Sequence, residues 1–464
     1  MPNSSPNFRW LIVALLVGFT FLGHFNRVSV SVAANAHFIG PGKLSEQQIG
    51  YVYSAFLLVY TILMIPGGWL IDRIGPHWAM TLMGVGLGTC AALTGALGWF
   101  GLSVAAMFVP LLLIRGIAGA SSVALHPGAA RAVSLWLPLR ERSTANGIIT
   151  AGALVGIAVC YPGFGWLMNR LDWPTAFVVS GGTLAVFGLL WYVLAADNPV
   201  GNHRLEMPNS PDSPDSPTSP TSDQAAQPPL SQEALDYADK EPPPTRHILN
   251  DFAALFRNRS LILITLSYGA IGYVQYMFFY WVEYYFTKVL DRPPSESREA
   301  AFIISISMAA GMFAGGLVSD GMCRWLGQSW GSRLMAMLGM GLSAVFCLLG
   351  ISTTDPDTVV AYFALSLGAM GLCEGIFWTT APVLESRRAG LACALMNTGG
   401  NGVGMLAPVI TPWIGKNYGW DTAVVVACCV AAVGAVLWLG IQTGTPVLAG
   451  YQSAADGPAG PNTR

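Results

Sequence analysis

Residues 11–34 read LIVALLVGFTFLGHFNRVSVSVAA, an apolar run interrupted near its middle by His24, Asn26 and Arg27. A helix of about 20 apolar residues crosses the hydrocarbon core of a bilayer, so this stretch predicts a membrane-spanning helix. An unpaired arginine at that depth costs at least about 2.5 kcal/mol on insertion scales. We therefore expect Arg27 to face a water-filled central cavity and to bind an anion. The alternative is that Arg27 snorkels to the membrane surface or pairs with a buried acid for folding.

The composition extends this interpretation to the whole chain. Of its 464 residues, 53% are hydrophobic and only 10% are charged, whereas soluble proteins average about 25% charged residues. The net charge of −2 and the absence of a basic patch argue against nucleic-acid binding. The eight cysteines lie in or beside apolar segments without metal-ligand spacing, so they are interpreted as small core residues. We expect a polytopic membrane protein without a cofactor or metal.

Apolar runs of spanning length occur in two sets of six. The first set lies near 10–35, 47–71, 78–99, 103–130, 143–168 and 174–196, and the second near 259–287, 297–320, 331–352, 357–384, 388–417 and 421–444. Residues 197–258 between them contain a Ser-Pro-rich tract and scattered acids, a composition that cannot bury a core. The sequence predicts an all-α protein with twelve transmembrane helices in two six-helix bundles. Its predicted parts are an N-terminal bundle (1–196), a largely disordered cytoplasmic linker (197–258), a C-terminal bundle (259–444) and a cytoplasmic tail (445–464).

The distribution of basic residues predicts the orientation. The loops on the side of both termini and the linker hold most of the lysines and arginines. Because cytoplasmic loops carry an excess of these residues, we expect both termini and the linker in the cytoplasm.

A short motif occurs twice, after the second and the eighth span. Its residues are Gly68, Asp72, Arg73 and Gly75 in the first copy and Gly316, Asp320 and Arg324 in the second. Glycine lets two helices approach closely, and an aspartate can cap or pair with a neighbouring helix end. We interpret the motif as a latch between helices that changes with conformation. A plain turn with charges at the membrane edge is the alternative for either copy alone.

The first copy resembles the signature after the second helix of the major facilitator superfamily, with His77 and Trp78 in place of its trailing basic pair. The other resembling stretches are Arg27–Ala33, Tyr53–Tyr60, Ile65–Gly68, Arg115–Gly119, Pro127 with Arg131, Ser134–Trp136 and Asn397–Asn401. Together they resemble the anion:cation symporter branch, which includes relatives of sialin and the vesicular glutamate transporters. The resemblance covers all twelve spans and implies proton-coupled uptake of organic anions, often sugar acids.

Two predicted helices carry polar stripes. They consist of Thr20, His24, Arg27 and Ser31 in the first span and of Arg115, Gly119, Ser122 and His126 in the fourth. Transporter sites lie near the bilayer midplane between the repeats, where two arginines could hold a carboxylate through charge-assisted hydrogen bonds. The resemblance likewise assigns the anion and its coupling to the positions of Arg27 and Arg115. Arg115 could instead relay protons or hold helices together.

The proton pathway departs from the branch's pattern. Proton-coupled members commonly have an aspartate at the position of Asn26 and an acid at that of Ser122, and neither residue here can titrate. Three other groups at membrane depth could carry the proton, namely Glu374, His24 and His126. The alternatives are a structural pair with an arginine for Glu374 and a packing role beside Pro127 for His126. Glu283, nearer the outer end of its span, is a weaker candidate.

Further contacts with a substrate are expected from the second, seventh, tenth and eleventh spans. They are Tyr60, Tyr273, Tyr276, Trp378, Asn397 and Asn401. Tyr273 and Tyr276 belong to a stripe with Tyr280 and Tyr284, which could equally serve packing. Two buried amides need hydrogen-bond partners, which a hydroxyl- or carboxylate-bearing substrate supplies. The alternative for Asn397 and Asn401 is a clamp that braces a close helix contact.

These observations predict a secondary transporter in the bacterial inner membrane that imports a small organic anion with protons by alternating access. We expect a monomer in the lipid bilayer, without nucleic-acid partners. A proton-independent facilitator or exporter of organic anions is one alternative, and a transporter-like membrane sensor that signals through the linker is another. An enzyme is not expected, because no nucleophile–base pair, metal spacing or phosphate-binding loop is present.

Overall fold

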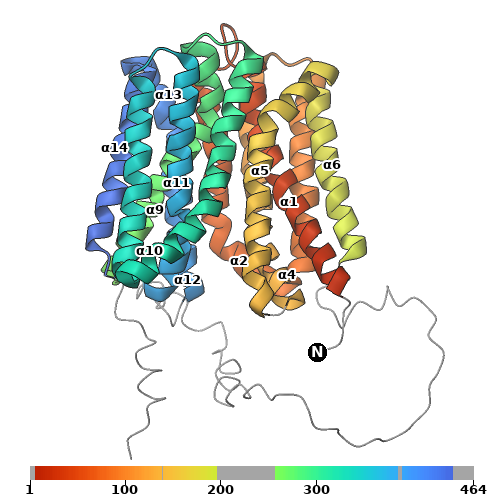
Figure 1. The fold of residues 1–464 in the computed structure, drawn as a ribbon. Helices are drawn as coiled ribbons and strands as arrows, with labels where there is room; N and C mark the ends of the chain where they lie inside the picture. Colours follow the sequence, from red (N-terminus) through yellow and green to blue (C-terminus); the bar gives the residue numbers. More distant parts are fainter. Residues whose placement is uncertain (1–5, 138, 196–255, 385–388, 443–464) are drawn as a thin grey trace, which may run out of the picture.

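The computed structural model describes residues 6–137, 139–195, 256–384 and 389–442, nearly all of them helical (Figure 1). Two groups of helices stand side by side. The N bundle comprises residues 6–195, coloured red to yellow, and the C bundle comprises residues 256–442, coloured green to blue. This confirms the predicted all-α architecture. Most of the predicted linker and the predicted tail lie outside the described residues.

In the N bundle, α1 (Pro6–Ala33) is extended by the π-helical turn η1 (Ala34–Phe38). The following helix, α2 (Glu46–Ala96), begins with a capping box. The Ser45 hydroxyl accepts from the backbone N–H of Gln48, and the Gln48 side chain accepts from the backbone N–H of Ser45, which satisfies two free donors at the helix start. The remaining elements are η2 (Leu97–Phe100), η3 (Val104–Met107), α3 (Phe108–Ser122), α4 (Leu125–Trp136), α5 (Leu139–Leu171) and α6 (Trp173–Leu194).

The C bundle repeats this plan. It consists of α9 (Arg259–Tyr284), η6 (Tyr285–Val289), α10 (Pro294–Ile351), α11 (Pro356–Leu384), α12 (Ala389–Gly404), α13 (Ala407–Tyr418), α14 (Trp420–Leu437) and η8 (Trp438–Gly440). Within the described ranges, 11 helices are long and apolar enough to cross a membrane, and each coincides with a predicted span. The other predicted span, 388–417, consists of α12 and α13, which are separated at residues 405–406. Pro408 in the first turn of α13 fits this break, because proline is tolerated where no N–H is needed.

The longest helices, α2 and α10, each contain two predicted spans joined at one glycine. Gly75 has φ 79° and ψ 159°, and Gly327 has φ 77° and ψ 157°. This backbone conformation is open essentially only to glycine, so each residue lets the chain reverse direction between two spans. The two bundles therefore use the same turn at corresponding places.

The structure refines the interpretation of the repeated motif. Asp72 lies just before the turn at Gly75, whereas Asp320 lies about one helical turn further from Gly327. A Cβ added to Gly68 or Gly316 would meet none of the described atoms within 4 Å, so no close helix approach to these two glycines is seen in the described part of the structure. The side chains of Asp72 and Asp320 lie outside the described part of the structure, and the latch stays a prediction.

Other glycines do set helix spacing within each bundle. A Cβ on Gly88 of α2 or Gly181 of α6 would collide with the backbone of the other helix. In the C bundle, a Cβ on Gly272 of α9 would collide with the backbone carbonyl of Gly400 on α12. Small residues let membrane helices pack at such short backbone distances.

The bundles contact each other most closely at one end. We call the end where α6 finishes and α9 begins the linker end, at the bottom of Figure 1, and the opposite end the distal end. Hydrogen bonds join the bundles through the distal half, between Asn35 and Glu283, Tyr284 and Glu46, Gln47 and Val409, Ser54 and Met405, and Tyr161 and Phe279. We call this set of contacts the distal seam. In this structure the distal seam is closed.

Candidate functional site

Arg27 lies on α1 where the two bundles meet. Its Nη2 donates a hydrogen bond of 2.8 Å to the hydroxyl of Tyr276 on α9. Its guanidinium carbon lies 4.9 Å from the ring centroid of Phe56, 5.7 Å from that of Tyr60 and 5.1 Å from that of Tyr276. Aromatic faces attract cations by about 0.5–2 kcal/mol, so these rings partly offset the cost of holding the charge at this depth.

Arg115 on α3 approaches the same position from inside the N bundle. Its Nη2 donates to the backbone carbonyl of Arg27 at 3.1 Å, and its guanidinium carbon lies 4.7 Å from the Phe56 centroid. One aromatic ring therefore lies beside both arginines. The ion pairs between described residues involve Arg292 or Arg298, so neither Arg27 nor Arg115 has an acidic partner there. Two neighbouring cations without a counter-ion form a site that an anion would stabilise.

A chain of polar groups continues from Arg27 into the C bundle. The Tyr276 hydroxyl accepts from Arg27 and donates to Oδ1 of Asn401 at 2.7 Å. The Asn401 amide nitrogen donates to the backbone carbonyl of Asn397 at 2.9 Å and to its side-chain oxygen at 3.2 Å. The structure thus brings together four of the residues that sequence predicted for substrate binding. Their polar groups could exchange these contacts for the carboxylate and hydroxyl groups of a ligand.

Glu374 belongs to a separate cluster inside the C bundle. It is 5% exposed, and its carboxylate accepts from the Tyr268 hydroxyl at 2.5 Å and from the Gln275 amide at 3.3 Å. Trp378 donates its indole N–H to the Tyr268 hydroxyl at 3.2 Å. The described partners of Glu374 are therefore neutral, and the alternative of a structural pair with an arginine is not seen among them.

His24 and His126 face each other from α1 and α4, with ring centroids 5.3 Å apart. The Nδ1 atom of His24 lies 2.9 Å from the backbone carbonyl of Thr20. Because a carbonyl can only accept, we assign the hydrogen to Nδ1, which leaves Nε2 as a proton acceptor. The pair is one helical turn from Arg27 but is not part of the hydrogen-bonded chain through Tyr276.

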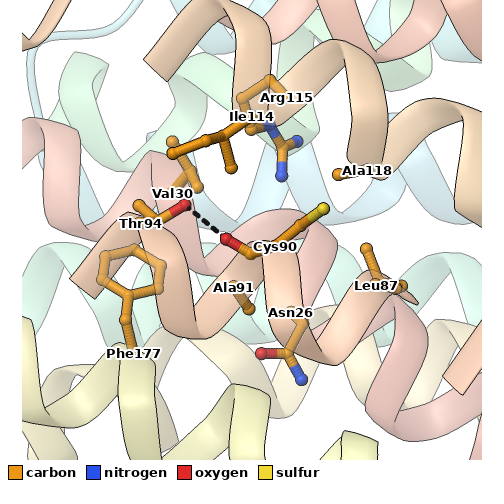
Figure 2. A pocket seen from close by; sticks show the side chains of 10 residues that line it. All are labelled: Asn26, Val30, Leu87, Cys90, Ala91, Thr94, Ile114, Arg115, Ala118 and Phe177. Carbon is orange, nitrogen blue, oxygen red and sulfur yellow. Dashed lines mark hydrogen bonds between the residues drawn. The ribbon is translucent and has the colours of Figure 1, made fainter. Parts of the chain in front are cut away.

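Asn26 points into the N bundle rather than toward the seam. Its amide nitrogen donates to the backbone carbonyls of Leu22 at 2.9 Å and Ser180 at 3.3 Å. Figure 2 shows Asn26 and Arg115 lining one small cavity with Thr94. Asn26 Oδ1 and Arg115 Nε are buried without a partner, and the cavity of about 10 Å³ has room for about one water molecule. Ser122 donates its hydroxyl to the carbonyl of Ala118 on its own helix.

The other predicted residues occupy varied environments. Tyr60 contributes a ring near Arg27, whereas Tyr273 is buried and its hydroxyl has no partner in the described structure. Trp378 remains 42% exposed.

Two contributors were not recognised as site residues from sequence. Phe56 was part of a resembling stretch, but nothing in the sequence indicated that both arginines share its ring. Tyr268 gave no signal, because a tyrosine in an apolar span is most often a packing residue. Its contact with Glu374 joins positions 106 residues apart.

This chain is similar in sequence to known proteins. A sequence model of the Major Facilitator Superfamily matches residues 8–327 and 321–458. The D-galactonate transporter of Escherichia coli O6:H1 is 25% identical over 93% of this chain and 95% of its own length. A probable galactarate/D-glucarate transporter of Bacillus subtilis (strain 168) is 26% identical over 92% of this chain and 90% of its own length. A probable sulfoacetate transporter of Cupriavidus necator is 25% identical, covering 94% of both chains.

Among solved structures, the fold is similar to a bacterial homologue of the human lysosomal transporter Spinster, crystallised in an inward-facing, unoccupied conformation. The TM-score is 0.70 at 16% identity, covering 95% of this chain and 98% of that one. At this identity the likeness concerns the fold alone.

Proposed function

This chain belongs to the Major Facilitator Superfamily, and on that premise we propose that it is a secondary transporter that imports a small organic anion together with protons by alternating access. It is a multi-pass membrane protein of the bacterial type and not an enzyme. We place it in the inner membrane with both termini and the linker in the cytoplasm, because the basic residues concentrate in the loops on that side.

The observation that carries the proposal is the pair of arginines beside Phe56. Arg27 lies at the interface of the bundles and Arg115 lies beside it inside the N bundle, and neither has an acid among its described partners. A substrate carboxylate would supply the missing negative charge through charge-assisted hydrogen bonds. The relatives named above are described as transporters of a sugar acid, of sugar diacids or of a sulfonated acid, all of them small anions. We therefore expect a carboxylate, and foremost a sugar acid, as substrate.

The hydrogen-bonded chain supports a polyhydroxylated substrate. If the carboxylate replaces the Tyr276 hydroxyl at Arg27, the Tyr276 oxygen is free to accept from a substrate hydroxyl, and the bond between Tyr276 and Asn401 can be exchanged for bonds to the substrate. Asn397 adds a third polar group on the same helix as Asn401. Hydroxyl groups both donate and accept, so they can satisfy all three residues.

The site also fits alternating access. Arg27 and Tyr276 come from different bundles, so movement of one bundle against the other opens and closes the space between them. In this conformation the distal seam blocks access from one side. A bound anion lowers the cost of burying Arg27, and we expect it to favour the transition between the two states.

Glu374 is our first candidate for the coupled proton. Its carboxyl group is buried and bonded to Tyr268 and Gln275, so protonation removes a negative charge without removing its neighbours. His24 is the second candidate, because its Nε2 atom can accept a proton next to His126. Asn26 and Ser122 cannot titrate.

A proton-independent facilitator or exporter is the second candidate function. The observation in its favour is Asn26, a neutral residue whose side-chain oxygen lines the cavity next to Arg115.

Uptake of radiolabelled D-galactonate and D-glucarate into proteoliposomes tests the proposal. We expect accumulation that is stronger when the outside is more acidic than the inside. Flux without any response to the pH gradient would favour the facilitator. If neither these acids nor a panel of other carboxylates and sulfonates is transported or shifts the unfolding temperature, the proposed anion function is wrong.

A further inference from the structure

Glu374 is a buried acid whose charge has no counter-ion among the described residues. The groups that face its carboxylate are Tyr268, Gln275 and Trp378, all of them neutral. We call these four residues the Glu374 cluster. A carboxylate has about four acceptor positions, and the described hydrogen bonds, from the Tyr268 hydroxyl and the Gln275 amide, use two of them. An ionised Glu374 therefore has acceptor positions left for a group that brings a positive charge.

Aromatic rings lie on one side of this carboxylate. The ring centroids of Tyr268 and Phe377 are 5.3 Å apart, and Tyr268 and Trp378 meet edge to face at 6.0 Å. Trp378 donates its indole N–H to the Tyr268 oxygen, so the hydroxyl hydrogen is directed at Glu374. An acid beside aromatic faces suits an ammonium group, which forms charge-assisted hydrogen bonds with the acid and cation–π contacts with the rings.

The Glu374 cluster is open on one side. Trp378, one helical turn from Glu374 toward the linker end, is 42% exposed. A Cβ added to Gly375, next to Glu374, would meet none of the described atoms within 4 Å. The distal seam is closed at the opposite end of the molecule, so we expect a ligand to reach the cluster from the linker end.

The separation between this cluster and Arg27 suits a short carbon chain. Tyr276 interacts electrostatically with both Arg27 and Glu374. Arg27 bonds to the Tyr276 hydroxyl. Glu374 bonds to Tyr268, which precedes Tyr276 on α9 by about two helical turns, or about 12 Å. An extended chain of about six carbons is about 6 Å long, and a hydrogen bond of about 2.9 Å at each end brings its reach to about 12 Å.

We propose that Glu374 binds an ammonium group at the far end of a substrate whose carboxylate is bound by Arg27, and we call this the ammonium site. The substrate class is then an aminated sugar acid with its two charges at opposite ends of a chain of about six carbons. This deepens the proposed function and rests on it for the carboxylate at Arg27. The ammonium group takes the place of the proton that Glu374 binds when the substrate is a plain sugar acid.

The test compares D-galactonate with 6-amino-6-deoxy-D-galactonate and 2-amino-2-deoxy-D-galactonate. Isothermal titration calorimetry on the full-length protein in detergent at about pH 7, where these amines are protonated, measures the three dissociation constants. We expect the 6-amino acid to bind at least about tenfold more tightly than D-galactonate. The 2-amino acid should lack this gain, because its ammonium group lies next to the carboxylate and cannot reach Glu374.

Substitutions then assign the gain to Glu374. Glu374→Gln keeps the size of the side chain but not its charge, so the ratio of the dissociation constants of D-galactonate and the 6-amino acid should fall to about one. Glu299→Gln, at an exposed acid of α10, is the matched control and should keep the wild-type ratio. Trp378→Leu removes an aromatic face and should lower the ratio about threefold. It also serves as the test if Glu374→Gln does not fold, and an unchanged ratio would then overturn the ammonium site.

The outcomes distinguish the ammonium site from the transport proposal. Equal binding of D-galactonate and the 6-amino acid, or a preference that persists in Glu374→Gln, would overturn the site even if anions are transported. Equal binding of the two amino acids would overturn the placement of the ammonium group at Glu374. A preference that is lost in Glu374→Gln supports the site even if neither acid is accumulated. If none of the three acids binds, the ammonium site is wrong, whereas the proposed function is decided by its wider panel of carboxylates and sulfonates.

Discussion

The central site and the distal seam differ in whether their buried charges have a counter-ion. At the centre, Arg27 and Arg115 lie beside one aromatic ring without an acidic partner in the described structure. At the distal seam, Arg298 is paired with Glu283 and enclosed by both bundles. A buried cation without a counter-ion favours a ligand, whereas a balanced pair favours a closed protein–protein contact. This difference supports separate roles for the two regions: the central site binds the substrate, and the distal seam controls access to it.

The largest effect is expected at the centre. Arg27→Ala should reduce anion uptake by at least about 100-fold, because it removes a charge-assisted contact that other groups cannot replace. The measurement is initial uptake into proteoliposomes, with unfolding temperature as the test of folding. Arg170→Ala, at an exposed arginine of α5, is the matched control and should transport normally. A stable Arg27→Ala protein with normal uptake would remove the basis for the central site.

The next effect concerns coupling. Glu374→Gln keeps the shape of the side chain but cannot bind or release a proton. We expect accumulation driven by a pH gradient to fall about tenfold or more, while exchange of labelled for unlabelled substrate continues. The variant should also lose the dependence of uptake on external pH. Unchanged accumulation in Glu374→Gln would direct attention to His24.

A smaller effect is expected from the hydroxyl that links the two bundles at the centre. Tyr276→Phe removes the group between Arg27 and Asn401 and should raise KM about tenfold, the loss of one hydrogen bond to a charged group. The matched control is Tyr273→Phe, because that hydroxyl is buried without a partner. Equal effects of the two substitutions on KM would mean that the hydrogen-bonded chain does not contribute to the substrate site.

The smallest effect is expected at an exposed ion pair, which is compared with the buried pair of the distal seam. Arg292 bonds to Glu296 and Asp357, which are exposed. Arg292→Ala should lower the free energy of unfolding by less than about 1 kcal/mol, as is typical of surface pairs. Arg298→Ala leaves Glu283 buried without its partner and should cost about 3–5 kcal/mol. Thermal unfolding in detergent compares the two, and similar losses would show that the seam pair is no more enclosed than the surface pair.

Much of the fold was predictable from local sequence. The length and hydrophobicity of the spans located eleven of the helices that can cross a membrane. The span at 388–417 was predicted as one helix, but the helix is interrupted at residues 405–406. Gly404 and Pro408 flank the interruption, and the sequence alone did not indicate where the helix would end. The structure places the two chain reversals at Gly75 and Gly327. The aspartate of the second motif copy lies one helical turn further from its glycine than the aspartate of the first copy does.

The sequence predicted many residues of the candidate site but few of the contacts between them. The sequence placed Arg27, Tyr276 and Asn401 in a polar centre, and the structure joins these three by hydrogen bonds. The sequence did not indicate that the side chain of Asn26, next to Arg27, would face the interior of the N bundle. Adjacent residues on a helix point about 100° apart, so one can face the seam while the other faces its own bundle.

The sequence by itself determined that this protein has membrane-spanning helices and an arginine at membrane depth, because hydrophobic length and composition are local properties. Only the tertiary structure decided which groups meet that arginine. Arg27 and Tyr276 are 249 residues apart, and Glu283 and Asn35 are 248 residues apart. Such contacts depend on how two bundles pack, and that packing places the unbalanced charge at the centre and the balanced pair at the distal seam.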